Sequence, residues 1–275
     1  MHTINLPPSR DHAEVDLGNA AGVSDRGLRH HRNEDAMALA SEVTQDGPVV
    51  VAVVCDGVSS SPRPDEASHV AAQAALPVLM AAVREGRDLI QASRAAVTAG
   101  RESVAQLHEP SHDTSATTFV SAVAAPGLVT LCWLGDSRAY WLTQPESESR
   151  QLTRDDSVAG GMVEAGLATE AAAMASPHAH VLTRWLGGDA VLDRDPKRAP
   201  HVEQYSPPGA GILLLCSDGL WNYLPEAGDL AELALPKALN DPLSAAVDMV
   251  QFAVEAGGAD NITAILIPYA NPGEP

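Results

Sequence analysis

The chain has 275 residues, enough for one large domain or two small ones, and 45% of them are hydrophobic, which excludes global disorder. Lys and Arg number 17 against 36 Asp and Glu, so the formal net charge is −19. Such an acidic chain repels phosphate backbones and anionic lipids, which argues against nucleic acid or a membrane surface as its main partner. The same excess of carboxylates suits hard divalent cations wherever several carboxylates converge.

The chain carries no pattern typical of export. The N-terminal stretch "MHTINLPPSRDHAEVD" is polar and interrupted by prolines. The longest apolar runs, near residues 49–55 and 212–216, are too short to span a bilayer. The cysteines lie singly in apolar runs without CxxC spacing, so we expect buried free thiols: Cys55, Cys132 and Cys216. We therefore expect a cytoplasmic protein without membrane insertion.

Strand and helix patterns follow one another in blocks along the chain. The run "VVVAVVCDG" predicts a buried strand that stops in a tight turn. Apolar spacings of three and four predict two long helices at 65–83 and 88–107, two short helices at 157–165 and 169–175, and a later helix at 241–256. Further strands are predicted at 117–124, 128–134 and 139–142, in "GILLLCSDG" and in "NITAILI". This order differs from strict strand–helix alternation and favours an α+β fold with mostly antiparallel sheets.

No linker divides the chain. We expect a flexible N-terminal tail at 1–13, a single catalytic domain at 14–268 and a C-terminal tail at 269–275.

Carboxylates recur where predicted strands end. An apolar strand followed at once by Asp places a rigid, partly desolvated carboxylate at the rim of a core, where it needs a partner. Four turns have this form: "VVCDG" (Asp56), "WLGDS" (Asp136), "LLCSDG" (Asp218) and "GGADN" (Asp260). A fifth acidic group, Glu34–Asp35, lies in the opening motif "GLRHHRNEDA". Because cations are few, convergence on Mg²⁺ or Mn²⁺ is the economical interpretation.

The order of motifs resembles that of the type-2C metal-dependent Ser/Thr protein phosphatase family, in its compact bacterial branch. The motifs are "SDRGLRHHRNEDA", "VVCDG", "SATTFVSAV", "LGDSRAYWL", "VEAGLAT…HVLTRWLGG", "LLCSDGLWNYL" and "DNITAILI". The resemblance covers about residues 15–268. It implies a four-layer α-β-β-α sandwich of two antiparallel sheets flanked by helix pairs, with a two-metal site at one end.

The resemblance also implies residue roles. Asp56, Asp218 and Asp260 would be the catalytic residues that hold the metals: Asp56 would bridge two ions, the Gly57 carbonyl would bind one of them, and Asp218 and Asp260 would complete its shell. Glu34 or Asp35 would support the second ion. Asp136 would hold a third, weaker ion. The nucleophile would be the bridging water that the cations activate, with no covalent phospho-enzyme.

The opening motif departs from the family pattern at the phosphate-binding position. The family carries Arg four residues before the Glu of this motif, and this chain has His30 there. Histidine is charged only below about pH 6.5 unless a neighbour raises its pKa, and it has no bidentate fork. The candidates for binding the substrate phosphate are therefore His30, Arg29 and Arg32.

Several other residues carry expectations of their own. After Asp56 the chain reads "DGVSSSPRPDEAS", and we expect residues 59–63 to cap the following helix rather than bind an anion. Thr117 and Thr118 should bond site carboxylates. The stretch 152–188 matches the mobile flap region of the family, with Asp156 where His is common in the family. The remaining histidines lack zinc spacing and are expected to be exposed or structural: His178, His180 and His201.

The expected function is hydrolysis of phosphoserine or phosphothreonine in a protein substrate, in a signalling system opposite a Ser/Thr kinase. A pseudophosphatase that binds phosphoproteins without turnover is one alternative, favoured by His30 and the altered turn. A small-molecule phosphatase on the same site is another.

Overall fold

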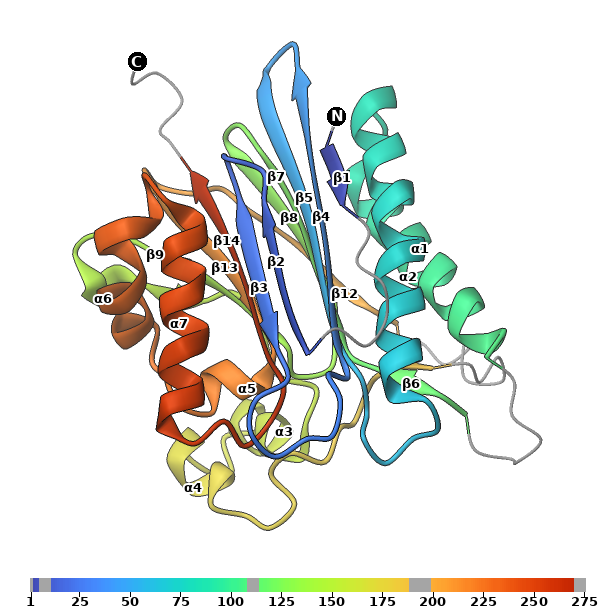
Figure 1. Ribbon diagram of the computed structural model, residues 1–275, viewed down its shortest axis with the longest axis vertical. Coiled ribbons are helices and arrows are strands. Elements are labelled where there is room, and N and C mark those ends of the chain that lie inside the picture. The colour runs from blue at the N-terminus through green and yellow to red at the C-terminus, as the bar shows by residue number, and fades with distance from the viewer. Residues whose placement is uncertain (1, 5–10, 108–113, 188–198, 270–275) are drawn as a thin grey trace.

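The computed structural model describes residues 2–4, 11–107, 114–187 and 199–269, and these form two antiparallel sheets packed face to face (Figure 1). The first sheet runs, in spatial order, β1 (His2–Ile4), β4 (Asp35–Thr44), β5 (Gly47–Asp56), β7 (Phe119–Ala125), β8 (Leu128–Leu134) and β12 (His201–Tyr205). The second runs β10 (Arg150–Gln151), β9 (Arg138–Leu142), β13 (Gly211–Cys216), β14 (Ile262–Tyr269), β3 (Ala21–Asp25) and β2 (His12–Asp16). A short ladder joins β6 (Ala116–Thr117) to β11 (Leu186–Gly187).

Helix pairs cover the outer face of each sheet. Helices α1 (Pro64–Glu85) and α2 (Leu89–Ala105) pack on the first sheet, and α6 (Ala227–Ala238) and α7 (Pro242–Ala256) pack on the second (Figure 1). The small helices α3 (Val158–Glu164), α4 (Glu170–Met174) and α5 (Asp218–Trp221) gather at one end of the sandwich. The four-layer α-β-β-α expectation is confirmed.

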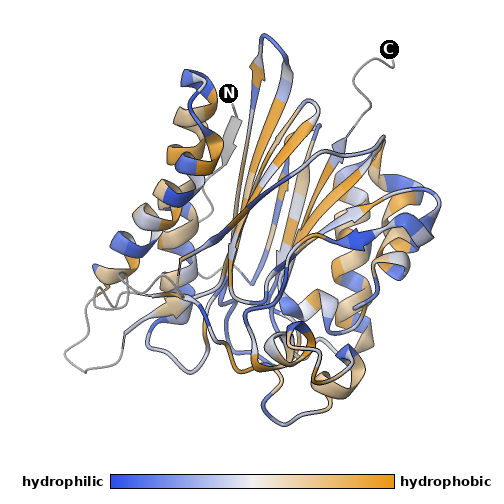
Figure 2. Cartoon of the chain, turned by 180° about the vertical axis from the view of Figure 1, so that it is seen from behind, coloured by the Kyte–Doolittle hydropathy of each residue, from blue (hydrophilic) through white to orange (hydrophobic). Residues whose placement is uncertain are grey.

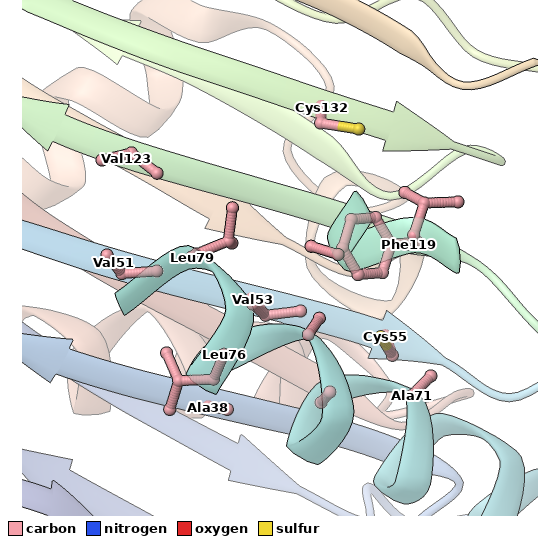
Figure 3. Close-up of a cluster of buried hydrophobic side chains, with 14 of the residues drawn as sticks. Ala38, Val51, Val53, Cys55, Ala71, Leu76, Leu79, Phe119, Val123 and Cys132 are labelled. Atoms are coloured by element: carbon pink, nitrogen blue, oxygen red, sulfur yellow. The ribbon is translucent and has the colours of Figure 1, made fainter. Parts of the chain in front are cut away.

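Strand β5 shows why the sandwich holds together. Side chains alternate across a strand, so a strand buried on both faces is a continuous apolar run. Val51, Val53 and Cys55 face α1, where they meet Leu76 and Leu79 (Figure 3). The residues between them face the second sheet: Val50, Ala52 and Val54. In Figure 2 the strands are accordingly hydrophobic along most of their length.

Helix α1 has clear end signals. Pro64 occupies its first turn and Gly86, in the left-handed conformation at φ 60°, closes its C-terminus. By length and composition α1 is the described helix that could cross a membrane, and half of its apolar window is buried inside the fold. Its small residues Ala71 and Ala75 are fully buried against α2 and the first sheet, as in a core helix.

Most predicted elements are confirmed, with small shifts of their ends. The predicted elements do not include helices α5 and α6 or strands β1, β2, β3, β4, β10, β11 and β12. The expected N-terminal tail at 1–13 differs from the structure, because β1 pairs with β4 and β2 begins at His12. Strand β1 lies at the edge of the first sheet next to β4, and its three residues are too few to give a period-2 signal in the sequence. The three cysteines are buried and free, as expected.

A cavity substitution tests the core between α1 and the first sheet. Leu79→Ala removes a side chain with no solvent exposure and should lower the free energy of unfolding by about 2–4 kcal/mol. Leu239→Ala, at a leucine that is 51% exposed, is the matched control and should change it by less than about 1 kcal/mol. Urea unfolding measures both, and equal losses would contradict this packing.

Candidate functional site

Four aspartates from four strand ends line one cavity. Asp56 ends β5, Asp136 follows β8, Asp218 opens α5 directly after β13, and Asp260 precedes β14. The cavity has a volume of about 660 Å³ and lies at the end of the sandwich where α3 and α5 gather (Figure 1). The structure therefore brings together the four aspartates that the strand–Asp pattern singled out.

The backbone of Asp56 is fixed by the neighbouring strand region. Its N–H donates to Thr118 Oγ1 at 2.9 Å, and its carbonyl accepts from Thr117 Oγ1 at 2.8 Å. The expectation that these threonines bond site carboxylates is wrong: they are buried, but they bond the peptide groups of Asp56. Their hydroxyls thus orient the strand end and leave the carboxylate free to face the cavity.

Two glycines next to site aspartates mark close backbone approaches. A Cβ on Gly57 would lie 2.4 Å from the Pro64 carbonyl oxygen, and one on Gly219 would lie 2.0 Å from the Asn261 carbonyl oxygen. Both contacts are far inside van der Waals distance, so no side chain fits. Glycine after Asp56 and Asp218 therefore serves close packing of the turns that carry the two carboxylates.

The two acidic residues of the opening motif occupy different places. Asp35 pairs with Asp56 across β4 and β5 and lies behind the cavity wall. Its Oδ2 accepts hydrogen bonds from Ser217 and Thr263, both at 2.7 Å, while its Oδ1 is buried without a partner. Burial raises the pKa of Asp35 to about 7, and the two hydroxyls oppose that rise.

Glu34 lies at the edge of the site. Its Oε2 accepts from the Ser59 hydroxyl at 2.6 Å and its Oε1 accepts from Arg32 Nε at 3.2 Å. Neither Glu34 nor Asp35 lines the cavity directly. This arrangement fits the expected supporting role better than direct ligation.

Asn261 is a site residue that sequence reasoning missed. It is 2% exposed, and its Oδ1 accepts from the Glu34 N–H at 2.7 Å. Its Nδ2 donates to the carbonyls of Arg26 and Arg32, at 2.8 and 3.1 Å. One side-chain amide thus holds the opening loop against the start of β14. The signal in the sequence was the Asn that directly follows Asp260 in "GGADN".

The electrostatics of the cavity favour a bound cation. Burial, followed by the charges of neighbouring carboxylates, raises the pKa values of Asp56 and Asp218 well above 3.8. Burial and the nearby Asp155 raise the pKa of Asp136 to about 7. Asp218 Oδ1 is buried without a hydrogen-bond partner. Converging carboxylate oxygens with unsatisfied lone pairs match the ligand preference of Mg²⁺ and Mn²⁺.

The three cationic candidates are not equivalent. His30 Nε2 lies 3.1 Å from Asp260 Oδ1, and its Nδ1 lies 4.0 Å from Glu34 Oε2. Arg32 bridges Glu34 and Asp65, at 3.2 and 3.3 Å. Arg29 is exposed and forms no ion pair within the described part of the chain. His30 and Arg32 are thus joined to the acidic cluster and Arg29 is not.

The residues after Gly57 do not cap α1, contrary to expectation. Ser59 bonds Glu34, and the Ser61 hydroxyl accepts from the Ala116 N–H at 3.1 Å. Arg63 occupies the N-cap position with φ 50° and no capping bond, and its guanidinium bonds Glu66. The serines instead connect the turn after Asp56 to Glu34 and to β6.

The flap, defined here as residues 152–187, is anchored through Asp156. The Asp156 N–H donates to the Gly135 carbonyl at 2.9 Å, and its carboxylate accepts from the Gly135 N–H at 3.2 Å. Asp156 Oδ1 also lies 3.2 Å from Arg184 Nη1 and 3.0 Å from His201 Nε2. His201 stacks on Trp133, at 4.7 Å between ring centroids. Asp156 therefore ties the flap to the turn that carries Asp136.

Of the remaining histidines, His178 is exposed and His201 is structural, as expected. His180 is exposed too, but it lies on the cavity wall with the site aspartates. Sequence reasoning gave it no site role, because it lies 38 residues before Asp218 with no ligand-like spacing.

Comparisons with known proteins agree with this geometry. The protein phosphatase 2C family matches residues 26–239. The serine/threonine phosphatase stp of Listeria monocytogenes is 30% identical over 253 residues, which cover 89% of this chain and 93% of that protein.

Solved structures give the same result. The Mycobacterium tuberculosis serine/threonine phosphatase PstP/Ppp superposes with a TM-score of 0.73 at 26% identity, over 92% of this chain and 98% of that one. The catalytic domain of the serine threonine protein phosphatase PstP, solved with two manganese ions, superposes with a TM-score of 0.69 at 25% identity, over 92% and 98%. The chain belongs to the protein phosphatase 2C family of phosphoprotein phosphatases.

Proposed function

We propose that this chain removes phosphate from phosphoserine or phosphothreonine of a protein substrate, using Mg²⁺ or Mn²⁺ held by the cavity aspartates. The observation that carries the proposal is the convergence of Asp56, Asp136, Asp218 and Asp260 on one cavity, where Asp218 Oδ1 is buried without a hydrogen-bond partner among the described residues. A non-catalytic scaffold gains nothing from such mutually repelling carboxylates, so no feature of the site favours the pseudophosphatase alternative.

Different residues of the site would have different roles in binding the metal ions, supporting the site and limiting solvent access. Asp56, Asp218, Asp260 and the Gly57 carbonyl would hold two ions, and Asp136 with Asp218 would hold a third. When bound, such ions polarise a phosphoryl oxygen and lower the pKa of water. Asp35 stiffens the base of the site through Ser217 and Thr263. The flap limits solvent access to the cavity through His180, Val181 and Leu182.

His30 and Arg32 are proposed to bind the substrate phosphate. His30 lies against Asp260, which lines the cavity, and Arg32 lies against Glu34 at the edge of the site, so a phosphate at the mouth of the cavity would meet their N–H donors while replacing part of that contact. Arg32 offers a planar guanidinium for bidentate contact, and His30 offers one or two single donors. The family's arginine function would thus be shared between two residues.

We further propose a cytoplasmic enzyme that opposes a Ser/Thr kinase in bacterial-type signalling. The net charge of −19 and the three buried free cysteines support this setting.

Metal-dependent turnover is the direct test of the function. The full chain should hydrolyse an aryl phosphate and a phosphothreonine peptide with Mn²⁺ and stop when EDTA is added. Asp218→Ala should lower kcat by about a hundredfold or more. Turnover that survives EDTA or Asp218→Ala would falsify the proposed mechanism, and a small phosphate ester strongly preferred over the peptide would favour the small-molecule alternative.

The raised pKa values predict how stability depends on pH without metal. In the unfolded chain Asp35 and Asp136 ionise near pH 3.8, whereas in the fold their pKa values rise to about 7. The folded state binds more protons between these two pKa values, so the free energy of unfolding should fall as pH rises from about 4 to about 7. Saturating Mn²⁺ should remove most of this decline.

Urea unfolding with EDTA or with Mn²⁺ measures the pH dependence of stability and its reduction by the metal. Asp218→Asn, which removes one repelling charge, should stabilise the metal-free protein and reduce its gain in stability from Mn²⁺. Equal pH slopes with EDTA and with Mn²⁺ would show that the carboxylate cluster is not the source of the dependence.

Kinetics of three variants test the phosphate contacts. His30→Ala and Arg32→Ala should each raise KM for the phosphopeptide about tenfold, because a hydrogen bond to a charged group is lost. Arg29→Ala, an adjacent exposed arginine, should leave KM unchanged, and His30→Arg should restore or lower it. If Arg29→Ala has the largest effect, the assignment of the phosphate contacts is wrong.

A further inference from the structure

His180 brings a flap side chain to two site aspartates. Its ligating nitrogen and one carboxylate oxygen each from Asp136 and Asp218 all lie within 4.8 Å of one another. The three residues come from separate parts of the fold: the flap, the turn after β8 and the start of α5. No hydrogen bond or ion pair joins the imidazole directly to either described carboxylate.

The spacing fits an ion between the three groups. An octahedral ion with bonds of about 2.1–2.2 Å places its ligand atoms roughly 3.0–4.3 Å apart. The three atoms here lie within 4.8 Å of one another, which is compatible with these distances. Asp136 is 6% exposed, lines the cavity, and forms no side-chain hydrogen bond with another described residue. Asp218 has one oxygen bonded to Asn222 at 3.2 Å and the other without a partner. Two carboxylates with free oxygens thus face the imidazole.

The ring of His180 is held in place by Trp221. The two rings stack with centroids 6.1 Å apart and an interplanar angle of 25°. Trp221 Nε1 donates to the Asp136 carbonyl at 3.0 Å, and the Arg138 guanidinium lies 3.7 Å from the Trp221 ring centroid. Such neighbours fix the direction of a metal ligand. The stack therefore links the imidazole to the backbone of one carboxylate.

The backbone on both sides of His180 is also fixed. The Ala179 carbonyl accepts from the Ala159 N–H at 3.2 Å, and the Val181 carbonyl accepts from the Val158 N–H at 2.9 Å. Both donors lie in the first turn of α3. His180 is thus presented to the cavity from a backbone that moves together with α3.

We propose that His180 is a flap-borne ligand of the cation bound by Asp136 and Asp218, and that it makes this position selective for a transition-metal ion such as Mn²⁺ over Mg²⁺. Imidazole nitrogen suits transition metals, whereas Mg²⁺ is held by oxygen. Occupation of the position then fastens the flap over the cavity. The inference rests on the proposed function, because Asp136 and Asp218 are metal-binding residues there.

Calorimetric titration of the full chain with Mn²⁺ and with Mg²⁺, without substrate, tests the selectivity. In the native protein a weak Mn²⁺ event should follow the tight ones. His180→Ala should weaken that event at least about tenfold, with little change in Mg²⁺ binding, and His178→Ala, an exposed flap histidine, is the matched control. Asp136→Asn should remove the weak event for both ions. An unchanged weak Mn²⁺ event in His180→Ala, or an equal loss in His178→Ala, would overturn the proposal.

Pulsed EPR of the Mn²⁺-loaded protein supplies a second readout. A nitrogen coupling from imidazole should be present in the native protein, in His178→Ala and in His30→Arg, and absent in His180→Ala. If the coupling is lost in His30→Arg and kept in His180→Ala, the nitrogen belongs to His30 and the proposal is wrong. Neither the titration nor the EPR measurement depends on turnover. An inactive protein that shows the His180 coupling would contradict only the proposed phosphatase function. An active protein without this coupling would contradict only the present inference.

Discussion

Mutual repulsion among buried carboxylates is the constraint on which this structure depends. Asp35, Asp56, Asp136 and Asp218 all have raised pKa values, because burial and one another's charges disfavour their ionised forms. A flexible frame would relax by moving them apart. The sandwich prevents this, since each aspartate lies at the start of, at the end of or just after a strand that is paired on both sides. The rigidity of the core is therefore what keeps a cation-binding geometry in place.

Hydrogen bonds from uncharged side chains also help to position the site. Thr117 and Thr118 fix the peptide groups of Asp56, and the Asn261 amide holds the opening loop. These groups satisfy backbone donors and acceptors without adding charge, so they position the acidic residues without neutralising them. The basic side chains of His30 and Arg32 lie at the rim of the site. The interior of the cluster is thus left for a metal, and the rim for phosphate.

Much of this arrangement could be predicted from the sequence, because it depends on local patterns. The continuous apolar run of β5, the helical spacing of α1 and α2, and the Asp next to a strand end carry their own signal. The hydrogen-bond partners of hydroxyl groups carry no such local signal. The predicted partners of the serines after Gly57 and of Thr117 and Thr118 are wrong, because a hydroxyl near a turn can bond several groups and the packing determines which one. Asn261 and His180 could not be assigned, because their partners are distant in the sequence.

The place of β14 in the second sheet bears on how the protein is made. This strand follows every other described element in the chain, yet it lies in the middle of its sheet, between β13 and β3. During synthesis from the N-terminus, β2 and β3 leave the ribosome early and have no partner on that side until residues 262–269 appear. Asp260 and Asn261 arrive at the same late moment, so neither the metal cluster nor the opening loop can be completed on a nascent chain. A polypeptide without this strand therefore lacks Asp260 and Asn261 at the site, and the site is complete only when β14 has entered the sheet.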